Sequence, residues 1–305
     1  MCSEGAPIAR TITVNRRGGA DFTKIQDAIN SVPANNKEWV HIVVKEGNYW
    51  ERVVVDRSFI YLQGQGRFNT FVENSNASMT DKSTTFDIKA DNFVAKNIAF
   101  KNNHNYAIVP NANVIRQAVA ARVRADKVAF YNCSFISVQD TLWDDSGRHL
   151  YQSCYIKGSV DYIFGAGQSH FENCILEQNG NRIQYQTGFI TAQGRENWND
   201  TNGFVFKNCA TSGSGKVFLG RAWRPYARVL FYNTYLSENV APQGWVAWYG
   251  APNVNNLVFA ESGCHGPGSN KAGRVLWEKT LSAEELNKLT SSSFIDAEGW
   301  AAQQP

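Results

Sequence analysis

One short phrase recurs along the chain as Phe130-Tyr131-Asn132-Cys133, Phe171-Glu172-Asn173-Cys174 and Phe206-Lys207-Asn208-Cys209. Each copy consists of an aromatic residue, a variable residue, asparagine and cysteine. Looser copies of the phrase end at Asn103, Cys154 and Thr234. Neighbouring copies end 20 to 35 residues apart, a spacing typical of repeat proteins whose units tolerate loop insertions. We therefore expect a fold built from one small repeated unit.

The segments around the phrase are short and rich in β-forming residues, as in Phe93-Val94-Ala95-Lys96-Asn97-Ile98-Ala99-Phe100. Short strands repeated at this spacing predict an all-β fold, a right-handed parallel β-helix, in which each turn of the chain forms one coil. Successive coils of such a solenoid stack about 4.8 Å apart, at the ordinary spacing between strands. A β-sandwich that contains the phrase by chance is the alternative, and the number of copies argues against it.

Stacked coils bring Cys133, Cys154 and Cys174 next to one another, because these residues hold one position in successive units. Neighbouring Cα atoms about 4.8 Å apart also lie within the range that a disulfide spans. The spacing leaves both a disulfide and a ladder of buried thiols open, and we expect the thiol ladder.

Both ends of a stack of coils need a cover. Thr23-Lys24-Ile25-Gln26 has the pattern of a capping box and opens an amphipathic segment that Pro33 ends. Ser282-Ala283-Glu284-Glu285 is a second capping box, near the other end of the chain. We expect short capping helices at the two ends, an N-terminal extension over residues 1–10 and a single domain over residues 11–305.

Composition excludes several classes of function. The 305 residues are 43% hydrophobic and 19% charged, and no apolar run is long enough to cross a bilayer, so we expect a folded protein without a membrane segment. The formal net charge is +3 and the basic residues are scattered, which argues against nucleic acid and favours a soluble polyanion as the partner. Cysteines and histidines lack the spacing of metal ligands, so we expect no metal ion and no other cofactor.

Two carboxylates share one position in adjacent units. Asp140 follows Cys133 by seven residues, and Asp161 follows Cys154 by the same number. Two carboxylates about one strand spacing apart cannot both ionise freely, so the pKa of one is raised and the other needs a cation to stay charged. The pair therefore predicts an acid and a nucleophile. Turn capping or a Ca²⁺ site is the alternative use of neighbouring aspartates.

Several segments resemble the signature segments of plant pectin methylesterases, carbohydrate esterase family 8. They are Gln117-Ala118-Val119-Ala120, Gln139-Asp140-Thr141-Leu142, Gly158-Ser159-Val160-Asp161-Tyr162-Ile163-Phe164-Gly165, Thr191-Ala192-Gln193-Gly194-Arg195 and Leu219-Gly220-Arg221-Ala222-Trp223. The resemblance runs in the same order from about Thr11 to Trp300. It implies a right-handed parallel β-helix and secretion to the plant cell wall.

The resemblance also implies catalytic roles. Asp161 is the nucleophile that attacks the methyl-ester carbonyl of a galacturonate unit. Asp140 first protonates the leaving methanol and then activates the hydrolytic water. Gln117 and Gln139 match the amide donors of the oxyanion hole. Arg221 keeps Asp161 ionised and oriented.

Aromatic residues complete the expected cleft. Trp223 is expected against the sugar of the substrate. Phe86, Trp143, Phe164 and Trp245 match other cleft aromatics of the family, although aromatic residues also fill protein cores.

Three positions depart from the commoner family pattern: Tyr162 replaces Phe, Ala222 replaces Pro and Arg224 replaces Lys. Ala222 resembles a subset of plant members that lack the N-terminal inhibitory region. The implied partners are pectin and a proteinaceous inhibitor, and we expect a monomer. The triplets that begin at Asn76 and Asn199 permit glycosylation of a secreted protein.

Three other functions fit the same fold. A pectin lyase needs aspartates that bind Ca²⁺ and a basic residue that removes a proton, and a pectin hydrolase needs several aspartates around the scissile bond. A pectin-binding module without activity would keep the aromatic and basic residues and lose the aspartate pair. The intact set of two aspartates, two glutamines and one arginine favours the esterase.

Overall fold

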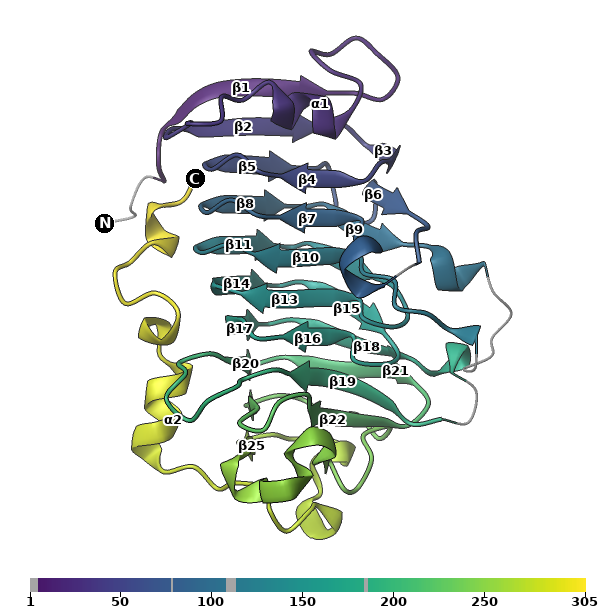
Figure 1. The fold of residues 1–305 in the computed structure, drawn as a ribbon, viewed down its shortest axis with the longest axis vertical. Helices are drawn as coiled ribbons and strands as arrows, with labels where there is room; N and C mark the ends of the chain where they lie inside the picture. Colours follow the sequence, from purple (N-terminus) through teal and green to yellow (C-terminus); the bar gives the residue numbers. More distant parts are fainter. Residues whose placement is uncertain (1–4, 78, 108–113, 184–185) are drawn as a thin grey trace.

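Three parallel β-sheets run along the molecule and enclose its apolar core (Figure 1). The structure is a computed structural model that describes residues 5–77, 79–107, 114–183 and 186–305. Within these residues the sheets have ten, eight and seven strands, and every strand pair is parallel. Successive turns of the chain contribute one strand to each sheet. The fold is the expected right-handed parallel β-helix.

The strands follow one another in a regular order. The ten-stranded sheet contains β1 (Ile8–Val14), β2 (Trp39–Val44), β5 (Ile60–Gln63), β8 (Phe93–Lys96), β11 (Val128–Tyr131), β14 (Arg148–Gln152), β17 (Gln168–Glu172), β20 (Gly203–Lys207), β23 (Arg228–Tyr232) and β25 (Val258–Ser262). The eight-stranded sheet contains β4 (Val53–Val55), β7 (Phe86–Ile88), β10 (Ala121–Arg124), β13 (Leu142–Ser146), β16 (Ile163–Gly165), β19 (Gly188–Gln193), β22 (Val217–Ala222) and β24 (Trp245–Val246). The seven-stranded sheet contains β3 (Gly47–Trp50), β6 (Thr70–Asn74), β9 (Ala99–Asn102), β12 (Ser134–Ile136), β15 (Tyr155–Gly158), β18 (Ile175–Asn179) and β21 (Ala210–Ser214).

The recurring phrase marks one corner of each coil. Tyr131 pairs with Gln152 and Gln152 pairs with Glu172, so the cysteines that follow two residues later lie one above another, as expected. The assignment of a looser copy that ends at Asn103 was wrong. Tyr131 also pairs with Lys96, so the equivalent segment is 95–98, which lacks both the aromatic residue and the cysteine that identify the phrase.

Asparagine recurs at this corner because the backbone turns there through the left-handed region. A side chain with a Cβ atom is disfavoured in that region, and asparagine tolerates it better than most residues. The corner asparagines with positive φ are Asn97 (56°), Asn132 (51°), Asn173 (54°), Asn208 (53°) and Asn233 (50°). The repeat in the sequence therefore reflects a repeated backbone conformation.

Replacing one corner asparagine tests this explanation. Asn208 is exposed and has a positive φ of 53°. We expect Asn208→Ala to lower the free energy of unfolding by about 1 kcal/mol, because alanine has a higher cost in the left-handed region. Asn208→Gly is the matched control and should be close to neutral. Denaturant unfolding measures both, and an equal loss for the two variants would contradict the conformational argument.

The five cysteines in the described part of the chain are free thiols. The sulfurs of four of them donate to carbonyl oxygens of the preceding coil. For example, Cys174 Sγ lies 3.3 Å from Tyr151 O, and Cys209 Sγ lies 3.2 Å from Phe171 O. Burial raises the pKa of the Cys174 thiol well above its usual value. The expected thiol ladder is therefore present, and it is a packing device inside the core.

Helix α1 (Ile25–Asn30) covers the N-terminal end of the stack and buries Ile25, Ala28 and Ile29 (Figure 1). The expected capping box of Thr23 was wrong, because the N-cap is Lys24 and no side chain of the segment caps the helix. Glu51 replaces it: its carboxylate accepts hydrogen bonds from the N–H groups of Ile25 (2.9 Å) and Gln26 (3.1 Å). A residue distant in sequence therefore satisfies the free amides of the first turn.

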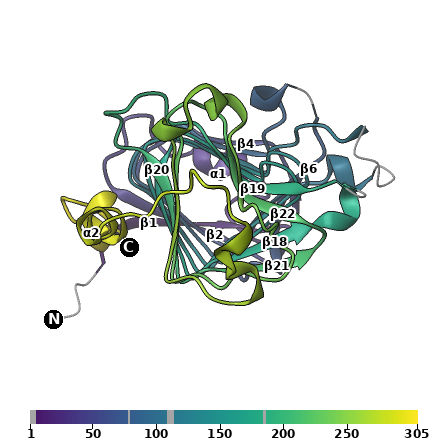
Figure 2. The same ribbon diagram turned by 90° about the horizontal axis from the view of Figure 1, so that it is seen from below.

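Helix α2 (Ala283–Thr290) begins with the expected capping box, formed by Ser282 and Glu285. Its predicted position at the C-terminal end of the stack was wrong. The helix lies along the outer face of the ten-stranded sheet (Figures 1 and 2), where Leu289 packs with Val205 and Leu230. The reason is that the outer face of this sheet carries apolar side chains that need a cover. Short 3₁₀ segments, η5 (Trp248–Asn256), η6 (Pro267–Ser269) and η7 (Lys271–Gly273), lie at the C-terminal end of the stack instead.

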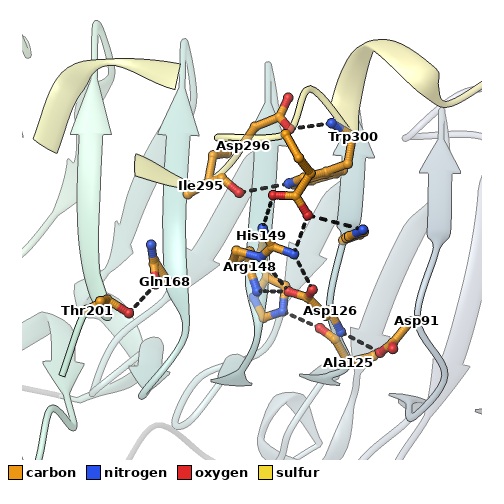
Figure 3. Close-up of polar contacts among 12 residues, drawn as sticks. Asp91, Ala125, Asp126, Arg148, His149, Gln168, Thr201, Ile295, Asp296 and Trp300 are labelled. Carbon is orange, nitrogen blue, oxygen red and sulfur yellow. Dashed lines mark hydrogen bonds and ion pairs between the residues drawn. The ribbon is translucent and has the colours of Figure 1, made fainter. Parts of the chain in front are cut away.

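The last residues run back along the same sheet toward the N-terminal end (Figure 1). Figure 3 shows the ion pairs and hydrogen bonds that hold them. Arg148 pairs with Asp126 and also with Glu298 of the tail, each at 2.5 Å, and Gln304 donates to Lys127 O at 3.0 Å.

Within the described residues, no helix is long and apolar enough to cross a membrane.

Candidate active site

A cleft of about 580 Å³ lies on the outer face of the eight-stranded sheet. The expected catalytic residues Asp140, Asp161, Gln117, Gln139 and Arg221 all line it. Strands β13, β16, β19 and β22 form its floor, and the corners that precede β13 and β16 supply the aspartates. The structure therefore brings the five polar residues together.

The cleft floor is one row of side chains across the sheet. Arg122 pairs with Trp143, Trp143 with Phe164, Phe164 with Ala192, and Ala192 with Arg221. Because side chains alternate along a strand, residues of one paired row point to the same face. This row points outward.

Phe86 and Trp245 belong to the neighbouring row, which points inward, so their expected place in the cleft was wrong. Phe86 is 0% and Trp245 is 1% exposed. Phe86 packs against Phe100 with ring centroids 4.5 Å apart, and Trp245 packs against Phe259 at 4.7 Å. The physical reason is strand alternation, since a shift of one residue reverses the face of the sheet. Both residues are part of the core.

Three of the expected aromatic residues do line the cleft. Trp143 and Phe164 stack with centroids 5.3 Å apart, and Phe164 meets Trp223 edge to face at 5.9 Å. All three belong to the cleft lining. Together they form an apolar wall suited to the face of a sugar ring.

Asp140 and Asp161 occupy the same corner of adjacent coils, as their spacing predicted. Gln139 pairs with Val160, and Asp140 N–H donates to Val160 O at 3.1 Å. Both aspartates are 7% exposed and have positive φ, 59° for Asp140 and 48° for Asp161. Positive φ is costly for a non-glycine residue, and strain of this kind concentrates at functional sites.

Arg221 pairs with Asp161 through two hydrogen bonds. Its Nε lies 2.8 Å from Oδ1 and its Nη2 lies 2.5 Å from Oδ2. Burial raises the pKa of Asp161, and the guanidinium of Arg221 opposes this rise. The pKa of Asp140 is raised well above its usual value, first by burial and then by the charge of Asp161. Asp140 therefore holds a proton at a pH at which Asp161 is ionised.

Trp248 and Phe189 enclose the guanidinium of Arg221. The Arg221 Cζ atom lies 3.9 Å from the ring centroid of Trp248 and 4.2 Å from that of Phe189. Trp248 has a φ of 41°, which is a strained value for a bulky residue. These cation–π contacts hold the guanidinium that binds Asp161.

The side-chain amides of Gln117 and Gln139 have no hydrogen-bond partner within the described residues. The two residues pair across adjacent coils and line the cleft. Within the described residues neither amide makes a hydrogen bond, so both are available as donors to a ligand. Two amide donors beside a carboxylate have the composition of an oxyanion hole.

The sequence did not identify four residues of the cleft lining: Met79, Thr80, Asp81 and Trp248. Thr80 and Asp81 belong to η1 (Thr80–Lys82), in the connection between β6 and β7. They lie outside the repeated phrase, and no local pattern marks them. Trp248 follows β24 by two residues. The resemblance pointed to the nearby Trp245 as the cleft aromatic instead.

Comparisons with known proteins agree with this geometry. The structure is similar to that of a pectin methylesterase from carrot, with a TM-score of 0.88 and 29% identity over 99% of this chain and 98% of that chain. It is also similar to a pectin methylesterase from Aspergillus niger, with a TM-score of 0.83 and 28% identity over 99% of both chains. The fold and the cleft place the protein among the esterases built on a parallel β-helix.

The sequence narrows this class. The family described as Pectinesterase matches residues 11–298. "Probable pectinesterase 29" and "Probable pectinesterase 55" of Arabidopsis thaliana are both 45% identical to this chain over 299 residues, which covers 96% of this chain and 89% and 91% of theirs. The chain belongs to the pectinesterase family.

Proposed function

We propose that the protein hydrolyses methyl esters of homogalacturonan in pectin to free carboxylates and methanol, with Asp161 as the nucleophile. The observation that supports this most strongly is the asymmetric aspartate pair. Arg221 binds Asp161 with two hydrogen bonds, at 2.8 and 2.5 Å, whereas burial and the charge of Asp161 raise the pKa of Asp140 well above its usual value. One carboxylate is held charged and the other is held as an acid.

The first half of the reaction forms an acyl-enzyme. A carboxylate oxygen of Asp161 attacks the ester carbonyl carbon, and the amides of Gln117 and Gln139 donate to the resulting oxyanion. The tetrahedral intermediate collapses as Asp140 gives its proton to the methoxy oxygen, and methanol leaves. Asp161 is then joined to the galacturonate carbonyl as an anhydride.

The second half regenerates the enzyme. Asp140, now ionised, takes a proton from a water molecule, whose oxygen attacks the galacturonate carbonyl of the anhydride. The bond to Asp161 breaks, which restores its carboxylate, and Asp140 is again protonated. The product forms as a carboxylic acid, releases its proton to the solvent and leaves as a carboxylate. Trp143, Phe164 and Trp223 bind the sugar rings throughout.

The products separate this function from its alternatives. On methylated pectin we expect methanol release without new reducing ends and without unsaturated products. New reducing ends would identify a hydrolase of the polymer, and unsaturated products would identify a lyase. A protein that binds pectin and releases none of the three would be a binding module.

The pH profile of kcat/KM should be bell-shaped. Asp161 must be ionised, and its buried pKa is raised, so activity falls as pH decreases through that value. Asp140 must be protonated, and its pKa is raised further, so activity also falls as pH increases through the higher value. Because the two groups interact, the two limbs report the pair. Measuring kcat/KM for methanol release as a function of pH tests this. A profile that does not fall at alkaline pH would contradict an acid role for Asp140.

Trp248 should act on catalysis through Arg221. We expect Trp248→Leu to lower kcat by about 30-fold, because a desolvated cation–π contact contributes about 2 kcal/mol. The acid limb of the pH profile should also shift upward, since a less ordered Arg221 stabilises ionised Asp161 less. Trp248→Phe keeps an aromatic face and should recover most of the activity. Equal losses for the two variants, with an unchanged acid limb, would contradict this role.

The setting of the activity follows from the proposed substrate. We propose that the protein acts outside the cell on the plant cell wall, as one domain over residues 11–305 and as a monomer. A proteinaceous inhibitor is the second proposed partner. Ser78, the last residue of the triplet that begins at Asn76, lies outside the described residues.

A further inference from the structure

A second cavity, of about 520 Å³, lies beside the ten-stranded sheet and shares no lining residue with the catalytic cleft. It opens between the loop that joins β19 to β20, the first residue of β23 and the C-terminal end of α2. We call it the lateral pocket. The residues that matter for its chemistry are Trp198, Asn199, Asp200, Thr201, Arg228 and Lys288.

Arg195 fixes the loop that forms one wall of the lateral pocket. This residue is 3% exposed, and its guanidinium donates to three backbone carbonyls, those of Trp198, Asp200 (2.9 Å) and Tyr226 (3.2 Å). The side chain of Trp198 is nevertheless 75% exposed. A rigid loop therefore presents a large aromatic ring to solvent, which is typical of a binding surface.

The base of the loop is also fixed. Thr201 Oγ1 donates to Gln168 Oε1 at 2.7 Å, which ties the loop to β17 (Figure 3). Arg228 Nη1 donates to Thr201 O at 3.0 Å and to Asn202 O at 3.3 Å. The pocket wall is therefore held from two strands, β17 and β23, before any ligand binds.

Positive charge dominates the lateral pocket. Within the described residues neither Arg228 nor Lys288 forms an ion pair with a carboxylate. Burial and the charge of Arg195 lower the pKa of Arg228 to about 10, and the charge of Asp200 opposes this change, so the group remains a cation at neutral pH. The carboxylate of Asp200 accepts from the N–H of Asn197 at 2.8 Å and keeps its negative charge, so the lining carries two cations and one anion. An anionic ligand would compensate these cations.

One other carboxylate lies close to these cations. Glu285 of α2 lines an adjoining depression together with Arg228 and Lys288. Its carboxylate accepts hydrogen bonds from the N–H and the hydroxyl of Ser282, at 2.8 and 2.9 Å, as part of the capping box. The capping box therefore holds the Glu285 carboxylate at the helix terminus, and within the described residues it forms no ion pair with Arg228 or Lys288.

We propose that the lateral pocket binds a uronate unit of a de-esterified polysaccharide. Trp198 supplies a face for the sugar ring, and Arg228 and Lys288 bind the carboxylate. Asn199 supplies an amide for the hydroxyl groups. The identity of the ligand as a galacturonate rests on the proposed function, because it is then the product of the enzyme.

The loop connects the lateral pocket to the catalytic cleft. Glu196 pairs with Arg224 at 2.9 Å, and a Cβ atom on Gly194 would lie only 3.0 Å from the ring of Trp223. One side of the loop therefore contacts the cleft and the other side forms the lateral pocket. A polymer that has been de-esterified can remain bound to the enzyme after its product unit leaves the cleft.

Calorimetric titration with fully de-esterified oligogalacturonate tests the proposal. The protein is produced in bacteria, so that no glycan on Asn199 fills the pocket, and it carries Trp223→Ala to weaken binding in the cleft. On this background we expect Trp198→Ala and Arg228→Gln each to weaken binding by about tenfold, the loss that one stacking contact or one charge-assisted hydrogen bond accounts for. Phe68→Ala and Lys96→Ala remove an exposed aromatic residue and an exposed cation elsewhere and should leave the affinity unchanged.

Two results would overturn the proposal. One is an unchanged affinity in Trp198→Ala, whose exposed side chain can be removed without disturbing the fold. The other is equal binding of fully methylated oligomers to a variant that also carries Asp161→Asn, which prevents their hydrolysis, because the cations would then recognise no carboxylate. The titration needs no turnover, so a failure of the proposed function appears separately, as an absence of methanol release by the wild-type protein.

Discussion

Asp161→Asn is expected to lower kcat for methanol release by at least about 10⁴-fold, the scale of loss when a catalytic nucleophile is removed. Asparagine has nearly the same shape as aspartate but no anionic oxygen that can attack an ester. The amides of Gln117 and Gln139 and the aromatic wall remain, so binding of pectin should change far less than turnover. Methanol release and a binding titration on the same variant measure the two effects.

The control for this variant is another buried aspartate that pairs with an arginine. Asp87 is 3% exposed, and its carboxylate accepts from Arg124 Nε at 3.2 Å and from Nη2 at 2.8 Å. Asp87→Asn removes a comparable ion pair outside the cleft lining, so it should change stability and leave kcat within about tenfold, as expected for a residue that does not touch the substrate. Wild-type turnover in Asp161→Asn with an unchanged circular dichroism spectrum would contradict the nucleophile assignment.

Asp140→Asn is expected to lower kcat by about 10²–10⁴-fold, the range that a general acid and base contributes. The amide can give no proton to methanol and can take none from water. The loss should depend on the leaving group. An activated aryl ester of galacturonate needs little protonation, so the first half of the reaction should recover, while the second half remains slow.

The kinetic signature of Asp140→Asn is therefore a burst. With an activated ester, one equivalent of leaving group should appear rapidly, followed by slow turnover as the anhydride hydrolyses. Rapid-mixing measurements detect this phase. A uniform loss for methyl and activated esters, without a burst, would mean that Asp140 acts only through the charge or position of Asp161.

Most of the expected site could be predicted because it lies at the corners of the coils. The phrase that repeats in the sequence fixes the length of each turn, and a count from its cysteine puts Asp140 beside Asp161 before any coordinates are known. The resemblance added Gln117, Gln139 and Arg221, and the structure brings all five to one cleft. Their catalytic roles remain predictions that the variants above test.

The aromatic residues were predicted less well for a definite reason. Phe86 and Trp143 both lie in short strands of the eight-stranded sheet, and both are surrounded by apolar residues. Strand pairing puts Arg122 in the row of Trp143 and Ala121 in the row of Phe86. Because both faces of these strands carry large apolar side chains, hydropathy did not show which row faces the ligand.

The sequence by itself determined the coiled architecture and the proximity of the two aspartates, since both depend on a local repeat in which the corner backbone demands the same residue in each turn. Only the tertiary structure decided which strand face is open, which residue caps α1 and which rings enclose Arg221. Glu51 reaches α1 from a later turn, and Trp248 and Phe189 reach Arg221 from different coils. Contacts of this kind join segments that share no local sequence pattern. They form only when the chain has folded, so the sequence pattern does not predict them.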